Sequence, residues 1–144
     1  MEQIDYRNIG ANAFKLLGAL AAYSRNCNID YKLVELAKLR ASQINGCANC
    51  VNLHVNTLRK LDETEERMHN MVVWFESDLF TEREKAALAW TEAVTLVADS
   101  HVPDDVYERA RAEFSEQELV DLTFAIVTIN AHNRLAVAFR RAVG

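Results

Sequence analysis

Helix breakers are scarce in this chain, and that scarcity constrains its fold more than any other feature. Only four glycines and one proline occur in 144 residues, while half of the residues are hydrophobic. Glycine and proline are the residues that most often end helices and form tight turns, so their scarcity favours long helices. Apolar residues recur at helical spacing, and no segment shows a convincing strand pattern. We therefore predict a single all-α domain over residues 1–144, with about six or seven helices.

Apolar periodicity and capping residues place these helices along the chain. In residues 9–24, small and apolar residues occupy almost every face of a helix, which predicts a helix packed on more than one side. Asp30 caps a second helix that runs to about Ile44, and the turn at Gly46 ends it. Further helices are expected at 47–61, around 68–75, from the capping box Thr81-Glu82-Arg83-Glu84, after Pro103, and from Ser115 to about Phe139.

The charge balance and the hydropathy pattern exclude several classes of protein. The net charge is −5, which provides no electrostatic surface for nucleic acid. No apolar run is long enough to span a membrane, and no signal-peptide pattern is present, so a cytoplasmic protein is expected. In that compartment a close cysteine pair is more often catalytic or metal-binding than a structural disulfide.

Such a pair occurs in the segment Ser42-Gln43-Ile44-Asn45-Gly46-Cys47-Ala48-Asn49-Cys50-Val51-Asn52-Leu53-His54. If a helix begins near Cys47, each residue advances by ~100°, so Cys47, Cys50 and His54 share one narrow stripe. The free N–H groups of the first turn stabilise a thiolate. His54 lies four residues after Cys50 and can accept its proton, while Cys47 is close enough to form a disulfide with Cys50. These features indicate a dithiol that can be oxidised and reduced repeatedly.

Other interpretations of the cysteine pair are weaker. A structural zinc site needs about four ligands, and no second cysteine pair is present. Covalent haem attachment requires a histidine directly after the second cysteine, where this chain has Val51. A thioredoxin-like domain requires strands that are not predicted, whereas two buried, unreactive cysteines remain an alternative. We therefore expect no cofactor and no metal. Cys27, in a polar connection between helices, is interpreted as incidental.

Several polar residues are ambiguous from periodicity alone. Glu35 lies on no apolar stripe, so helix geometry by itself predicts a solvated surface charge. Asn130, His132, Asn133 and Arg134 interrupt the apolar run of the last helix. They either hydrogen-bond at buried helix ends and to a neighbouring subunit, or line a pocket above the thiols. We favour the structural role, because buried polar groups usually have hydrogen-bond partners.

Glu35, the segment 42–50 and His54 together resemble the signature of the AhpD-like alkylhydroperoxidase and carboxymuconolactone decarboxylase family. The segment 129–136 also resembles the end of small family members. The likeness is sharpest between Glu35 and His54 and looser over nearly the whole chain. It implies an AhpD-like helical domain with the cysteine pair at the N-terminus of a core helix. It also implies assembly as a trimer or hexamer.

By this resemblance, Glu35, Cys47, Cys50 and His54 form the redox centre of a thiol-dependent alkyl hydroperoxide reductase. Glu35 and His54 would relay protons, and Cys50 would attack an organic hydroperoxide or hydrogen peroxide to become a sulfenic acid. Cys47 would then form the disulfide, and a dithiol reductant, lipoyl-bearing or thioredoxin-like, would reduce it.

Two features qualify the resemblance. True lactone decarboxylases of the family generally lack the cysteine pair, so its presence argues against that reaction. Asn49 stands where the peroxidase of the family has a histidine, and this difference bears on peroxidase strength. The alternative function is a disulfide-exchange adaptor or redox sensor with little peroxidase turnover. A third interpretation is an oligomeric helical scaffold with a vestigial site.

Overall fold

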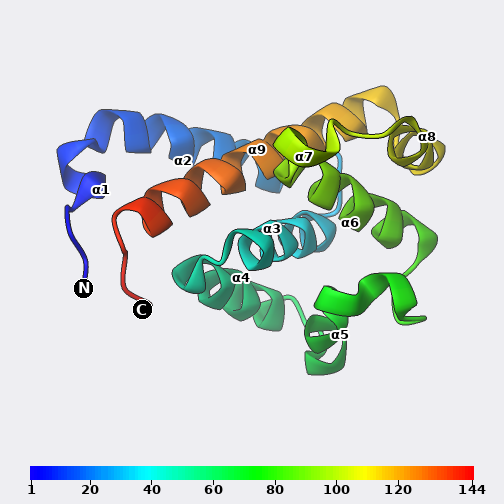
Figure 1. Ribbon diagram of the computed structural model, residues 1–144, viewed down its shortest axis with the longest axis horizontal. Helices are drawn as coiled ribbons and strands as arrows, with labels where there is room; N and C mark the ends of the chain where they lie inside the picture. The colour runs from blue at the N-terminus through cyan, green and yellow to red at the C-terminus, as the bar shows by residue number, and fades with distance from the viewer.

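The fold is built around one helix, α3 (Tyr31–Asn45), which contacts four other long helices. The computed structural model describes residues 1–144, and none of them forms a strand. The neighbours of α3 are α2 (Ala11–Asn26), α4 (Ala48–Lys60), α6 (Glu82–Thr95) and α9 (Glu116–Ala138). Figure 1 shows α3 in the middle of the molecule, with α4 beside it and α9 crossing the same region. Because helices cover it on several sides, α3 buries most of its length.

The predicted all-α fold is confirmed, and the remaining elements are short. They are α1 (Tyr6–Ile9), α5 (Glu65–Asn70), the 3-10 helix η1 (Met71–Glu76), α7 (Val97–Ser100) and α8 (Asp104–Glu113). The helix expected around 68–75 is divided between α5 and η1, where Val73 has non-helical dihedral angles. The one-turn helices α1 and α7 were not predicted, because four residues are too few to show a periodic pattern.

Two apolar cores lie on different sides of α3. One core packs α3 against α6, α8 and α9, and α3 contributes Leu33, Val34 and Ala37 to it. The other packs α3 against α4, α5, η1 and α6, and Leu36 and Leu39 belong to it. Two faces of one helix thus anchor both halves of the molecule.

The expectation for α2 is wrong within the single chain. Ser24 is the only buried residue of α2, and Leu16 is 72% exposed. The helix packs through one face on α9 and α3. The sequence pattern shows that apolar residues lie on all sides of the helix, but it does not show which surfaces pack against them. No helix of the structure is long and apolar enough to cross a membrane.

Candidate functional site

A tight turn between α3 and α4 positions the cysteine pair. Gly46 adopts a left-handed conformation with φ of 66°, and its N–H donates to the carbonyls of Ser42 and Gln43. The Cys47 N–H also donates to the Ser42 carbonyl, at 3.0 Å. Glycine adopts positive φ without the steric cost of a Cβ atom, so α3 can end and α4 can begin within two residues. Cys47 is the N-cap of α4, so the helix begins at Ala48, one position after the predicted start.

Cys47 and Cys50 form a disulfide in this structure. Both are buried, and the Cys50 N–H donates to the Cys47 sulfur at 3.3 Å, so that sulfur takes the place of a capping oxygen. Cys50 lies in the first turn of α4, where free N–H groups favour a thiolate once the disulfide is reduced. The spacing argument therefore places the two sulfurs correctly.

His54 and Glu35 form a buried pair that joins α4 to α3. The His54 Nδ1 lies 2.5 Å from Glu35 Oε2, and the two side chains are 9% and 3% exposed. The solvated surface charge expected for Glu35 from periodicity alone is therefore wrong. The two partners are separated by 19 positions in the sequence, and the turn at Gly46 lies between them, so the contact depends on how α3 and α4 pack.

The ionisation of Glu35 determines which nitrogen of His54 carries a proton. Burial raises the pKa of Glu35, but the His54 hydrogen bond, the charges of His54 and Lys38, and the Tyr31 hydroxyl outweigh burial and lower it. Glu35 is therefore a carboxylate at neutral pH. The His54 Nδ1–H donates to it, which makes Nε2 the ring nitrogen available for proton exchange.

Cys50 and His54 line the same cavity, which has a volume of about 280 Å³. Glu35, Asn49 and His132 also line it, so three helices, α3, α4 and α9, bring polar groups to one place. Cys47 does not line this cavity and instead borders an open hollow on the outer side of α4. The disulfide thus lies between the cavity and this hollow, and both of its cysteines are buried.

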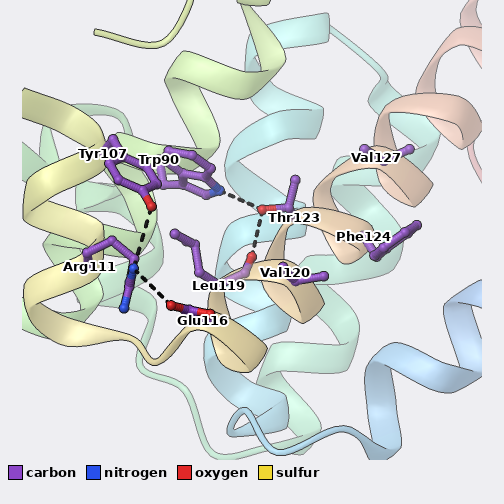
Figure 2. Close-up of a pocket in the computed structure, with 9 residues that line it drawn as sticks. All are labelled: Trp90, Tyr107, Arg111, Glu116, Leu119, Val120, Thr123, Phe124 and Val127. Carbon is purple, nitrogen blue, oxygen red and sulfur yellow. Dashed lines mark hydrogen bonds and ion pairs between the residues drawn. The ribbon is translucent and has the colours of Figure 1, made fainter. Parts of the chain in front are cut away.

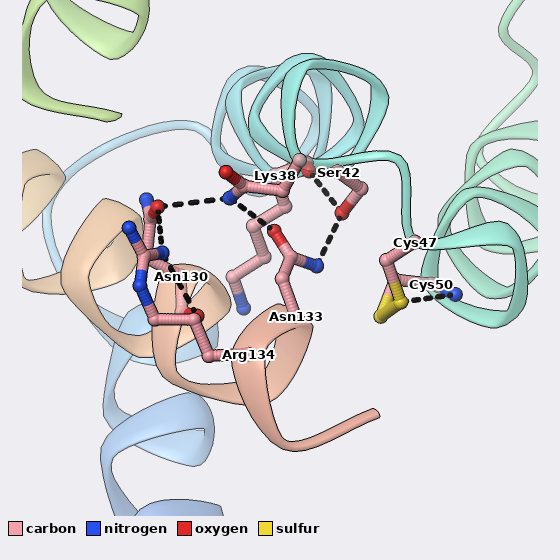
Figure 3. Close-up of a disulfide and its surroundings, with 8 residues drawn as sticks. Lys38, Ser42, Cys47, Cys50, Asn130, Asn133 and Arg134 are labelled. Atoms are coloured by element: carbon pink, nitrogen blue, oxygen red, sulfur yellow. Dashed lines mark hydrogen bonds between the residues drawn. A yellow bond between two sulfur atoms is a disulfide. The ribbon is translucent and has the colours of Figure 1, made fainter. Parts of the chain in front are cut away.

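The polar residues of α9 divide between the two predicted roles. The Asn45 amide donates to Asn130 Oδ1 at 2.9 Å and to Asn133 Oδ1 at 3.0 Å, and the Asn133 amide donates to Ser42 Oγ at 3.0 Å. Figure 3 shows Asn133 and Ser42 facing each other beside the turn that leads to Cys47. These asparagines have the predicted structural role within the chain, because they fasten α9 to the end of α3.

The other two polar residues of that segment behave differently. His132 lines the cavity, and burial lowers its pKa, as do the nearby charges of Lys38, His54 and Arg141. Arg134 is exposed and donates to the Asn130 side chain. The preference for a structural role therefore fails for His132, because the helix turns this side chain toward α2 and α4 rather than toward α3.

A larger hollow of about 440 Å³ lies between α6, α8 and α9, and it lacks the groups that redox chemistry needs. Figure 2 shows the Trp90 ring, whose N–H donates to Thr123 Oγ1 at 2.9 Å, and Arg111 near Glu116. Arg111 and Glu116 already pair, at 3.9 Å. None of the lining residues is a cysteine or histidine. The structure also contains no group of three or more His, Cys, Asp or Glu residues that could hold a metal ion.

Sequence reasoning missed several residues of the cavity. Asn49, which the sequence did not identify as a site residue, is 9% exposed and lines the cavity. Tyr31, Arg25 and Arg141 also line it, although they come from three separate segments. Neither helical spacing nor a local motif relates these segments, so no signal in the sequence identified them.

Comparisons with known proteins place this site in a family. The model of the carboxymuconolactone decarboxylase family matches residues 11–93, more than half of the chain. The uncharacterized protein YdfG of Bacillus subtilis is 36% identical over 137 residues, which are 95% of this chain and 93% of YdfG.

Solved structures share the fold. One is a protein of unknown function from Agrobacterium tumefaciens, ATU0492, for which a role as the antioxidant defence protein AhpD has been suggested. It superposes with a TM-score of 0.97 at 42% identity, over 100% of this chain and 99% of that one. A peroxidase-related protein with an AhpD core from Ralstonia eutropha superposes with a TM-score of 0.80 at 19% identity, over 93% and 72% of the two chains. The chain therefore belongs to the carboxymuconolactone decarboxylase family and has its AhpD-like fold.

Proposed function

We propose that this protein is a thiol-dependent alkyl hydroperoxide reductase. The observation that carries the proposal is the meeting of Cys50 and the His54–Glu35 pair at one buried cavity, with a second cysteine in disulfide contact. A peroxidase of this kind needs an activated thiol, a proton acceptor of fixed orientation, and a partner thiol that traps the oxidised product. The suggested antioxidant role of the Agrobacterium protein supports the same proposal.

The first half of the cycle oxidises Cys50. His54 Nε2 takes the proton of the reduced Cys50 thiol, and the Glu35 carboxylate stabilises the imidazolium that forms. The thiolate attacks the terminal oxygen of the hydroperoxide, so an S–O bond forms and the O–O bond breaks. The leaving alkoxide takes the proton from His54 and departs as an alcohol, or as water when the substrate is hydrogen peroxide. Cys50 is left as a sulfenic acid.

The second half restores the dithiol. The Cys47 thiol attacks the sulfenic sulfur, so the disulfide forms and water leaves. An external dithiol, lipoyl-bearing or thioredoxin-like, then transfers two electrons by thiol–disulfide exchange and becomes a disulfide itself. Cys47 borders the outer hollow, so this hollow is the side from which we expect a partner to approach the disulfide.

The second candidate is a disulfide-exchange adaptor or redox sensor with little peroxidase turnover. One observation favours it: Cys47 borders the open hollow outside α4. The resemblance adds that Asn49 stands where the peroxidase of the family has a histidine. Under this alternative the same disulfide would exchange with protein partners, and the cavity would contribute mainly to its redox potential.

Steady-state consumption of cumene hydroperoxide, with dihydrolipoamide as reductant, distinguishes the candidates. Cys50→Ser should reduce the rate to background. With dihydrolipoamide omitted, Cys47→Ser should consume one equivalent of hydroperoxide and accumulate a sulfenic acid on Cys50 that dimedone traps. Cys27→Ser, at a half-buried cysteine outside the cavity, is the matched control and should retain the wild-type rate. Equal rates for wild type and Cys50→Ser would overturn the proposal, and disulfide exchange without peroxide consumption would favour the adaptor.

We also propose a homo-oligomer, a trimer or hexamer, in which residues 1–144 act as one domain in the cytoplasm. Apolar side chains on α2 and α9 are exposed in the single chain, including Leu16, Phe124 and Val127. A groove of about 600 Å³ along α1, α2 and α9 is lined almost wholly by apolar residues. Exposed apolar surface of this kind is typical of subunit interfaces. A cytoplasmic location would supply the dithiol reductants that the cycle requires.

A further inference from the structure

The cavity that contains Cys50 has a positively charged wall. Arg25, Lys38 and Arg141 line it, whereas Glu35 is its only acidic residue and already binds His54. None of the three cations forms an ion pair with a carboxylate anywhere in the structure. The whole chain has a net charge of −5, so the sign of the charge at this cavity is opposite to that of the protein.

Lys38 is the most unusual member of this group. It is 4% exposed, and Figure 3 shows its side chain extending from α3 toward α9. Its Nζ donates one hydrogen bond, to Ser24 Oγ at 2.9 Å. An ammonium group has three N–H donors, so two of them have no acceptor within the protein. Glu35 is close enough to act on this charge, but it already binds His54 and forms no ion pair with Lys38. Burying a charge is costly unless it is hydrogen-bonded, so an anion in the cavity would stabilise Lys38 by accepting from its free donors.

The basic side chains act on one another across the cavity. Burial lowers the pKa of Lys38, Glu35 opposes that change, and the charge of Arg25 lowers the pKa further. Burial lowers the pKa of His132, and the charges of Lys38, His54 and Arg141 lower it further. Each of these groups therefore lies within the field of the next, and an anion placed among them would interact favourably with several at once.

The other walls of the cavity define the rest of the ligand. Phe14, Leu53 and Ile129 supply apolar surface, and the space of about 280 Å³ accommodates a small molecule rather than a long chain. A ligand that satisfies both walls has a compact apolar body and one negatively charged group. A carboxylate suits Lys38 and the guanidinium groups, because charge-assisted hydrogen bonds to it are the strong ones.

We propose that the cavity selects small organic anions, and that the hydroperoxide it reduces carries a carboxylate bound by Lys38. This proposal rests on the peroxidase function proposed above and specifies its substrate class. The carboxylate contacts Lys38, while the hydroperoxide group of the same molecule reaches Cys50 and His54. The oxidation and its atom balance are unchanged, because the carboxylate binds without reacting.

A matched pair of substrates tests the proposal: cumene hydroperoxide and its para-carboxylate derivative. The quantity to measure is the ratio of their kcat/KM values at neutral pH. Wild type should favour the carboxylate by about 10-fold, the effect expected for one charge-assisted hydrogen bond. Lys38→Met should reduce the ratio toward one, and Lys38→Arg should retain part of it. Lys60→Met removes an exposed lysine on α4 and should leave the ratio unchanged.

A binding measurement separates failure of this proposal from failure of the peroxidase function. 4-Isopropylbenzoate is titrated by calorimetry into the wild-type protein, with 4-isopropylbenzamide as the neutral control. Tighter binding of the carboxylate supports the anion site, even if the protein consumes no peroxide. Equal binding of the two compounds, together with equal kcat/KM for the two hydroperoxides, overturns the anion site while leaving the peroxidase function intact. Because this titration uses the wild-type chain, it does not depend on whether a Lys38 variant folds.

Discussion

Replacing His54 by leucine would leave the Glu35 carboxylate buried without its nearest partner. Leucine has a similar volume but no donor, and Glu35 is 3% exposed, so water does not substitute easily. Burial is the largest influence on the pKa of Glu35, and the His54 hydrogen bond is the next largest, acting in the opposite direction. Once that hydrogen bond is removed, burial prevails and the pKa of Glu35 rises above its ordinary value.

Proton uptake sets an upper limit on the cost of this change. pH 7 lies 2.5 units above the ordinary glutamate pKa of 4.5. Each unit is about 1.4 kcal/mol, so neutralising Glu35 in the folded protein at pH 7 costs about 3.4 kcal/mol. Lys38 and Tyr31 still favour the charged form, which reduces the penalty. We expect the free energy of unfolding to fall by about 1 to 3 kcal/mol at pH 7.

The penalty should depend on pH with a definite sign. In wild type the pKa of Glu35 is lowered, so its stabilising contribution is present above pH 4.5 and is lost as the pH falls through the folded-state pKa. In His54→Leu the pKa is raised, so stability instead falls as the pH rises above 4.5. The difference in unfolding free energy between the two proteins should therefore grow from pH 4 to pH 7.

Urea unfolding followed by circular dichroism, with the disulfide intact and at one protein concentration, measures this difference. His69→Leu is the matched control, because it also removes a histidine beside a glutamate, but His69 is 77% exposed and lies 3.8 Å from Glu65. The double variant Glu35→Gln/His54→Leu should lose this change of the stability difference with pH, since no carboxyl remains at position 35. An equal stability difference at pH 4 and pH 7 for His54→Leu would refute the argument that Glu35 and His54 are coupled.

Two further predictions concern the frame of the site. Gly46→Ala should destabilise the protein by about 1 kcal/mol, because φ is 66°; nothing crowds the new Cβ, so the backbone conformation alone sets the cost. Gly18→Ala is the control: this position is inside α2 and equally uncrowded, so the change should be neutral or stabilising. Thermal unfolding measures both effects. Asn133→Leu removes the bond to Ser42 and one from Asn45, so a loss of about 2 to 3 kcal/mol is expected in urea. Disulfide formation in Asn133→Leu should also slow, and an unchanged rate would show that α9 does not position the turn.

Local sequence determined much of this protein. The scarcity of glycine and proline determined long helices, and Asp30, Thr81 and Ser115 cap three of them as predicted. Cys47, Cys50 and His54 lie within eight residues, so the periodicity of a single helix was enough to bring them to one side. These features are local, because hydrogen bonding and side-chain spacing within a helix depend on nearby residues alone.

Tertiary structure decided the rest of the site. Helix geometry predicted a surface charge at Glu35, but the packing of α2, α4 and α9 buries both Glu35 and Lys38. His132 lines the cavity because of the direction in which α9 runs across α2 and α4. The same packing leaves Leu16 exposed on a helix whose sequence suggested burial on several sides. Periodicity shows which residues share a face, but the free energy of a buried charge depends on neighbours that are distant in the chain. Packing between helices therefore decides which charges are buried and which partners they meet.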